Sequence, residues 1–196
     1  EGVKMESIPL MDRLKKCRDK GTVVSIYSDA ADPEKFSVGV ILAVSPKWTA
    51  VDCLGTEGEY TGLSAIPTKS IYSIVYGDRY TKTVAAAWDG RQAGLCVTGA
   101  VEADPLCGAL EYAAENRLVA DIEFAQSGCW DMTGYVRDIS NGVAQIQPVD
   151  ENGETDGECF CDMSVITWVD VRPGGDGKSK PGPGGVILFK SPDGNK

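Results

Sequence analysis

The sequence predicts a mainly β protein made of two tandem five-stranded small barrels, each preceded by a short N-terminal helix. Three observations predict this class. The same spacing of glycines and apolar residues occurs twice along the 196 residues, about 95 positions apart. Each copy carries about five short segments that are rich in β-branched residues and alternate in polarity. Each copy also opens on a proline that is followed by about three helical turns.

The repeat is found by sliding the chain along itself, which places residues 36–75 on residues 131–169. A change of one residue in the offset extends the match upstream, from 8–26 onto 104–122. Glycines and apolar residues then coincide at Gly39 and Gly134, Val51 and Ile146, Gly58 and Gly153, Gly62 and Gly157, Leu14 and Leu110, and Val23 and Val119. Agreement in one register indicates a tandem duplication.

The first unit is predicted to span residues 5–80. Its helix begins at Pro9, because proline suits the first turn of a helix. Five strands follow, each short and rich in β-branched or aromatic residues. They are predicted at 23–27, 37–45, 48–54, 61–67 and 71–76.

The second unit is predicted to span residues 104–172, after a linker over 81–103. Its helix begins at Asp104-Pro105, and its strands are expected at 119–124, 132–140, 142–149, 157–163 and 165–171. A Gly/Pro-rich tail over 173–196 has the composition of a flexible linker. Within it, GVILFK (185–190) is either unstructured or a short strand that caps a free sheet edge.

Five short strands joined by tight turns cannot bury a flat two-sided sheet, so each unit is expected to curl into a barrel. Each unit has a glycine in its second strand (VGVILAVS and TGYVRDIS), an apolar third strand and a closing I-x-x-I/V (IYSI and ITWV). These motifs resemble the Sm-like (LSm/Hfq) fold, an SH3-like small barrel. The turn DENGETDG and the tyrosines of YGDRY (76–80) are similar to those of bacterial Sm-like proteins of unassigned function.

The resemblance implies how the units assemble, because in Sm-like proteins the fourth strand of one barrel pairs with the fifth strand of the next. The two copies are therefore expected to dock as a pseudo-dimer, with apolar faces buried near 71–76 and 165–169. The remaining outer edges are expected to serve self-association or a protein partner. The Asp and Asn with which Sm proteins bind uridine are not clearly present in the loops at 45–49 and 140–143. The fold therefore carries over better than RNA binding does.

Charge disfavours RNA as a partner. Residues 121–171 hold eleven acidic residues against one basic residue, Arg137, whereas residues 21–80 hold seven acidic and four basic residues. Affinity for nucleic acid depends largely on phosphate neutralisation by Lys and Arg, so only the first barrel is a candidate. Lys47 and Lys69 would contact phosphates, and Trp48 would stack on a base or, alternatively, cap the mouth of the barrel.

No catalytic motif is found: histidine is absent, and the chain has no G-x-S-x-G, phosphate-binding loop or dinucleotide fingerprint. Cys159 and Cys161 share one face of a strand and Cys53 is expected nearby, which suggests either a metal site or buried cysteines. The acidic stretch 150–157 (DENGETDG) is interpreted as a hairpin turn, because the matching GTEGEYTG keeps the glycines but has no counterpart of Asp150 and Asp156. A weak calcium site and a hydrolase acid cluster are the alternatives. No metal or cofactor is predicted.

The sequence therefore predicts a non-catalytic interaction or scaffold module that assembles through barrel edge strands. An RNA-binding protein that uses the first, less acidic barrel is the alternative. No apolar run reaches the roughly 18–20 residues of a membrane helix. No signal-like sequence opens the chain, and cysteines without a disulfide framework are typical of a cytoplasmic protein.

Overall fold

The computed structural model describes residues 9–30, 32–88, 103–150 and 153–173. The first unit contains α1 (Leu10–Asp19), β1 (Val23–Tyr27), β2 (Ser37–Val44), β3 (Trp48–Leu54), β4 (Tyr60–Pro67), the 3-10 turn η1 (Thr68–Ser70), β5 (Ser73–Val75) and α2 (Arg79–Ala87). The second unit contains α4 (Pro105–Asn116), β6 (Val119–Phe124), β7 (Met132–Ser140), β8 (Val143–Pro148), β9 (Cys159–Asp162), the 3-10 turn η2 (Met163–Val165) and β10 (Ile166–Val171). The mainly β class and the five strands of each unit are confirmed.

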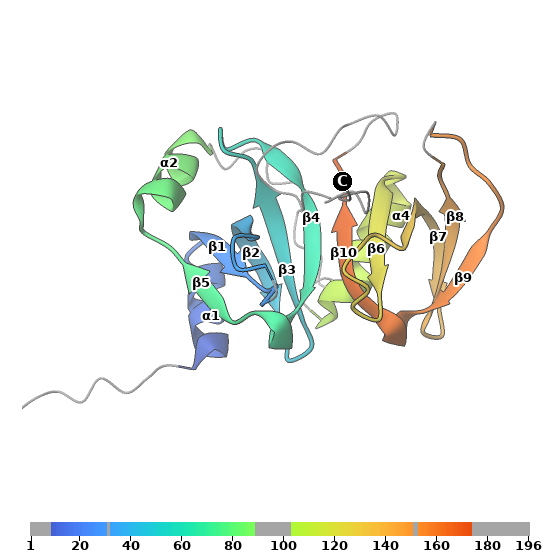
Figure 1. Ribbon diagram of the computed structural model, residues 1–196, viewed down its shortest axis with the longest axis horizontal. Helices are drawn as coiled ribbons and strands as arrows, with labels where there is room; N and C mark the ends of the chain where they lie inside the picture. Colours follow the sequence, from blue (N-terminus) through green and yellow to red (C-terminus); the bar gives the residue numbers. More distant parts are fainter. Residues whose placement is uncertain (1–8, 31, 89–102, 151–152, 174–196) are drawn as a thin grey trace, which may run out of the picture.

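The ten strands form one open antiparallel sheet in the order β5-β1-β2-β3-β4-β10-β6-β7-β8-β9 (Figure 1). Within each unit the fifth strand lies beside the first, and the fourth strand lies at the opposite end. Two separate closed barrels are therefore not what the hydrogen bonds define, because pairing of β4 with β10 continues one unit into the other. Among the described residues, β5 and β9 are the two outer edges.

The expected docking of the two copies is half correct. The segment near 165–169 lies at the junction, where β10 pairs with β4. The prediction that residues 71–76 are also buried there is wrong, because β5 pairs with β1 at the far edge of the sheet. Tyr72 and Tyr76, which flank β5, are 46% and 42% exposed. Among the described strands, the fifth strand of the first unit thus has one neighbour, whereas the fifth strand of the second unit has two.

Backbone geometry repeats between the units in the predicted register. The pairing of β2 with β3 shifts between Ile41 and Ala43, and the pairing of β7 with β8 shifts at the matching positions, Val136 and Asp138. The amide of Thr68 in η1 donates to the Lys47 carbonyl at 2.9 Å, and the matching bond runs from Met163 to Gly142 at 2.8 Å. The duplication inferred from sequence is therefore also a duplication of bulges and turns.

The matched glycines of the second strands lie where the backbone of the third strand passes very close. A Cβ on Gly39 would lie 2.0 Å from the Asp52 carbonyl oxygen, and a Cβ on Gly134 would lie 2.4 Å from the Gln147 oxygen. Real side chains do not tolerate such distances, so glycine is required where the neighbouring strand crosses closely. The close approach of the second and third strands therefore depends on a glycine that the sequence repeats in both units.

The helices begin as the sequence predicts, with one addition. Pro9 precedes α1, and the Asp104 side chain caps α4 by accepting from the Leu106 and Cys107 amides. Helix α2 occupies the first part of the expected linker 81–103 and is capped by Asp78, which accepts from the Thr81 amide at 3.0 Å. Its Val84 is fully buried against β1, β2 and β3. Among the described residues, no helix is long and apolar enough to cross a membrane.

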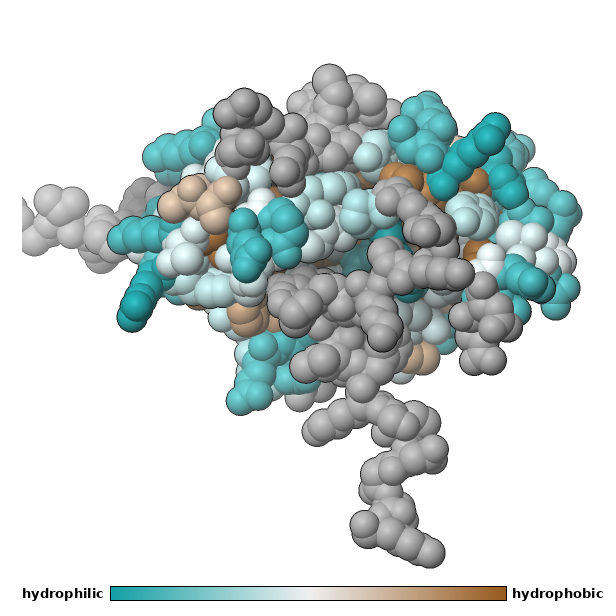
Figure 2. All heavy atoms as spheres, turned by 90° about the horizontal axis from the view of Figure 1, so that it is seen from above, coloured by the Kyte–Doolittle hydropathy of each residue, from teal (hydrophilic) through white to brown (hydrophobic). Residues whose placement is uncertain are grey.

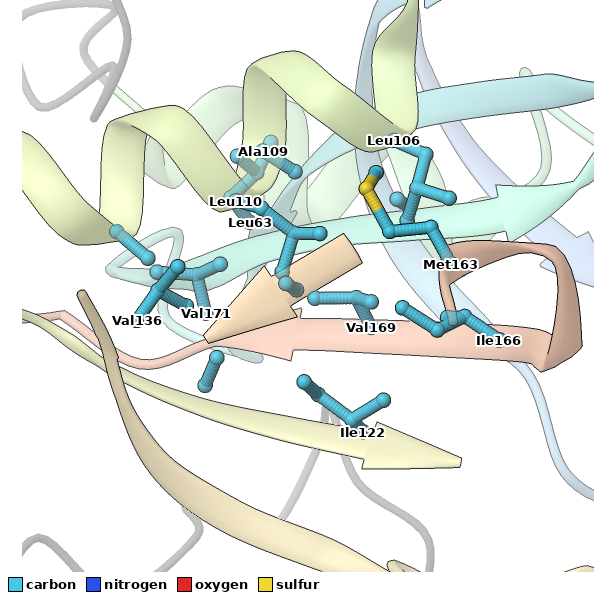
Figure 3. Close-up of a cluster of buried hydrophobic side chains, with 14 of the residues drawn as sticks. Leu63, Leu106, Ala109, Leu110, Ile122, Val136, Met163, Ile166, Val169 and Val171 are labelled. Atoms are coloured by element: carbon cyan, nitrogen blue, oxygen red, sulfur yellow. The ribbon is translucent and has the colours of Figure 1, made fainter. Parts of the chain in front are cut away.

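The largest apolar core crosses the boundary between the units. Leu63 of β4 packs with Leu106, Ala109 and Leu110 of α4 and with Val169 and Val171 of β10 (Figure 3). The first unit also has its own core around Leu14, Ile26, Val51 and Ile66. Because one cluster of buried side chains draws on both units, the junction is part of the fold rather than a loose contact between domains.

Candidate functional site

At the junction between the units, the edge strand β4 of the first unit pairs with the edge strand β10 of the second. Val169, Asp170 and Val171 of β10 are the Cα partners of Ala65, Ser64 and Leu63 of β4. Ala65 and Val169 are fully buried, and Leu63 and Val171 are 1% exposed. The strands thus pair through the backbone while apolar side chains close over one face of the sheet.

A polar network lies at the junction. The Ser64 hydroxyl donates a short hydrogen bond to Oδ1 of Asp170, and Nε1 of Trp168 donates to the same oxygen at 3.0 Å. Behind Ser64, its hydroxyl oxygen lies 3.1 Å from Sγ of Cys53. Burial raises the pKa of Asp170 to about 6, against the opposing effect of the two hydrogen bonds. Burial also raises the pKa of the Cys53 thiol to about 12, so this cysteine stays protonated.

A second carboxylate stands beside Asp170. Asp121 of β6 is its Cα partner and is 3% exposed. Its Oδ1 accepts from Nη2 of Arg172 at 2.7 Å and from the Thr133 hydroxyl at 2.6 Å. Oδ1 of Asp170 and both carboxylate oxygens of Asp121 therefore accept from neighbouring side chains, as in a structural network rather than a reactive pair of carboxylates.

Sequence reasoning missed this network. Asp121 and Asp170 interrupt the apolar strands VADIEF and ITWVDV, and alternation alone assigns such residues to a solvent-facing side. The signal that was present is their matching placement on two adjacent strands, next to Arg172. The burial of Asp170 could not be inferred from this signal alone, because it results from the pairing of β10 with a second neighbour, β4.

The two free edges carry exposed apolar side chains. Around β5 these are Tyr72, Val75 and Tyr76, and around β9 they are Val143, Phe160 and Val165, with Phe160 the most exposed at 65%. Two of these match buried positions at the junction: Tyr76 corresponds to Val171, and Phe160 corresponds to Ala65. At these two positions an exposed aromatic residue therefore stands where the internal junction buries an aliphatic one. Figure 2 shows hydrophobic patches among hydrophilic side chains over the second unit, at the right.

The predicted RNA-binding residues lie at one end of the first unit. Lys47 precedes β3 and Lys69 lies in η1, and the two segments are joined by the Thr68 amide and hydroxyl, which bond to Lys47 and Ser45. Both lysines are exposed. Trp48 is partly buried and packs against the core that the two units share, so part of its ring surface is covered.

The cysteines predicted as a possible metal site are not brought together. Cys161 is buried in the second unit and its Sγ lies 3.6 Å from the Ala144 carbonyl, whereas Cys53 is buried in the first unit. Five strands separate β3 from β9 in the sheet. Among the described residues, no three His, Cys, Asp or Glu side chains form a group suited to a metal ion.

The acidic stretch 150–157 forms the predicted turn. The Asp150 amide donates to the Glu154 carbonyl at 2.9 Å, and the Gly55 amide of the first unit donates to Glu59 at 2.8 Å. The matched glycines, Gly58 and Gly153, have φ values of 77° and 82°. The described residues of the two stretches therefore share this backbone pattern, although the first unit lacks both aspartates. The predicted edge strand at 185–190 lies outside the described residues.

Comparison of the chain with protein-family models, with curated proteins and with solved structures gave no match.

Proposed function

We propose that this protein is a non-catalytic interaction module that assembles with other protein chains through its two free edge strands, β5 and β9. The observation that carries the proposal is the relation between free and joined edges. In the order of each unit, β9 is the counterpart of β4, and β5 is the counterpart of β10. Since β4 and β10 pair within the chain, β9 of one copy offers the same kind of edge to β5 of the next. Repeated head-to-tail contacts of this kind give rings or linear arrays.

We also propose that each unit is a small Sm-like barrel. Support comes from the shared strand order, fifth-first-second-third-fourth, and from the close strand crossings at Gly39 and Gly134. The repeated 3-10 turn before the last strand of each unit adds to it. The absence of catalysis in this proposal rests on the engaged hydrogen bonds of Asp121 and Asp170 and on the lack of histidine.

The assembly is tested by blocking one edge at a time. Phe160→Lys blocks β9 and Tyr76→Lys blocks β5, and both positions are exposed, so the fold should tolerate a lysine. Ala85→Lys, at an exposed position of α2, is the matched control. Sedimentation across a concentration series measures mass. We expect the wild type and the control to associate, and each blocked variant to stay monomeric.

Mixing the two blocked variants gives the sharper result. Phe160→Lys retains a good β5 edge and Tyr76→Lys retains a good β9 edge, so an equimolar mixture should form a dimer and nothing larger. A mixture that stays monomeric while the wild type associates would show that these edges do not pair head to tail. A wild type that stays monomeric would count against self-assembly altogether.

RNA binding through the first barrel is the second candidate function. The observation in its favour is that the exposed Lys47 and Lys69 lie at one end of the sheet, on segments that hydrogen-bond to each other. The partial burial of Trp48 removes part of its stacking surface, and the acidic second unit opposes phosphate. The protein-interaction proposal therefore has the stronger support.

A further inference from the structure

The internal junction contains a second contact besides the β4–β10 pairing. Helix α4 of the second unit lies against β3 and β4 of the first, where Ala43, Ala50 and Ala65 form a row of cross-strand partners. These alanines are at most 1% exposed and share a core with Ala109 and Ala113 of α4. Small residues on both sides allow the helix to lie close to the sheet.

The corresponding row in the second unit has a different chemistry. Asp138, Gln145 and Phe160 take the places of the three alanines and are again cross-strand partners on one face. Asp138 and Phe160 are exposed and Gln145 is half-buried. Glu158, which matches Leu63, adds a second acid to this face and is also exposed. We call Asp138, Gln145, Glu158 and Phe160 the acidic face.

Helix α1, which corresponds to α4, carries basic residues where α4 carries uncharged ones. In the register set by the two helix ends, where Thr22 donates to Cys17 and Leu118 donates to Ala113, Arg13 of α1 takes the place of Ala109. Lys16 takes the place of Tyr112. Arg13 is half-buried, and Lys16 is exposed on the same helix. The helix therefore carries cations where the strand row carries acids.

We propose that α1 of a second copy lies on the acidic face of β7, β8 and β9, as α4 lies on the alanine row within the chain. This inference rests on the proposed head-to-tail pairing of β9 with β5, which places the next copy's α1 beside this face. Arg13 then meets Asp138 and Phe160, and Lys16 lies on the side of Glu158. The internal helix contact is apolar, whereas the external one pairs opposite charges.

Two features bear on the balance of charge at this contact. Arg137, next to Asp138 on β7, is engaged by its own neighbours: its guanidinium donates to Gln147 and stands 5.6 Å from the Tyr135 ring. Asp138 accepts from the Ser140 hydroxyl at 3.0 Å, a neutral donor that leaves the carboxylate charge in place for a cation of the partner. The whole chain has a net charge of −10, so copies repel one another in general. Local complementarity is needed to overcome this repulsion, and it fixes which surfaces meet.

The contact is tested by charge reversal in the full chain. Arg13→Glu should weaken association by about fivefold or more, because it places a third acid against Asp138 and Glu158. Lys82→Glu, at an exposed position of α2, changes the net charge equally and is the matched control. Adding Asp138→Arg with Glu158→Arg to the Arg13→Glu chain should restore association. Dissociation constants come from sedimentation, and melting curves confirm folding.

The outcomes separate this inference from the proposed function. If Arg13→Glu behaves like Lys82→Glu while Tyr76→Lys abolishes association, the charged contact is overturned and strand pairing stands. If the arginine pair rescues Arg13→Glu while Tyr76→Lys associates like the wild type, the charged contact stands and strand pairing is overturned. A wild type that is monomeric at every concentration overturns both.

Discussion

The Ser64 hydroxyl of β4 donates to the Asp170 carboxylate of β10, and the two residues are Cα partners in the strand pairing that joins the units. A carboxylate at the centre of a junction makes the junction respond to pH. Cys53 lies behind Ser64, Trp168 donates to the same carboxylate oxygen, and Asp121 and Arg172 flank the group on the other side.

The first prediction concerns the pH dependence of Asp170. Its pKa is raised from 3.8 to about 6 in the folded chain, mainly by burial, so the folded state binds the proton more tightly than the unfolded state does. The contribution of this group to the free energy of unfolding therefore falls as pH rises from about 4 to about 6 and stays low above that range. Asp170→Asn should remove this part of the pH dependence.

Denaturant unfolding of the wild type and Asp170→Asn at pH 4.5 and pH 7.5 measures the effect as a difference, in which the other acids cancel. Because Asp170 is partly exposed, we expect the asparagine chain to gain about 1–2 kcal/mol relative to the wild type between the two pH values. Ser64→Ala is the companion variant and should destabilise at both pH values. A difference that does not change with pH would show that Asp170 ionises normally.

The second prediction concerns the matched glycines of the second strands. Gly39→Ala and Gly134→Ala should each cost about 2–3 kcal/mol or more of stability, because the new methyl group would overlap a backbone carbonyl of the next strand. Gly21→Ala is the control: its φ is +57° but nothing lies within 4 Å of the added Cβ. It should cost about 1 kcal/mol for the backbone conformation alone. Equal losses at all three positions would contradict the close strand crossing.

The strands were predictable because glycines, β-branched residues and turns recur in two copies, and each copy checks the other. Strand limits were less certain where side chains face the edge: β5 is only Ser73–Val75, and β9 is only Cys159–Asp162. Helix α2 was missed because most of it was assigned to the linker between the units, although its buried residues Thr81 and Val84 lie three positions apart, as on one face of a helix. Its N-cap, Asp78 with Thr81, was the available signal.

The junction could be predicted only in part, because local pattern does not say which edges meet. The segment near Trp168 was placed correctly, but the same reasoning also buried residues 71–76, which one chain cannot do with a single head-to-tail contact. The acidic face was invisible to sequence reasoning for a related reason. Asp138 and Phe160 are ordinary surface residues until the packing of Ala43 and Ala65 shows what their positions touch.

The third prediction concerns RNA. Fluorescence anisotropy with labelled oligo-U and oligo-A should show no binding tighter than roughly 100 μM at about 0.15 M salt. The reason is that acidic residues outnumber basic residues in the strand regions of both units, so phosphates are repelled. Lys47→Glu with Lys69→Glu should leave the signal unchanged. Tight, salt-sensitive binding that those two substitutions abolish, and that Lys82→Glu does not, would favour the RNA-binding function instead.

The last prediction concerns calcium and the turn at 150–157. The turn and its counterpart share backbone hydrogen bonds and a glycine with positive φ, and the counterpart lacks both aspartates, so the fold should need the glycine and not a metal. EDTA should leave the melting temperature unchanged, and so should Asp156→Asn. Gly153→Ala, at φ 82°, should lower stability by about 1 kcal/mol. A loss of several degrees in EDTA that calcium restores, or a loss in Asp156→Asn that exceeds the loss in Gly153→Ala, would mean that the acids bind an ion on which the turn depends.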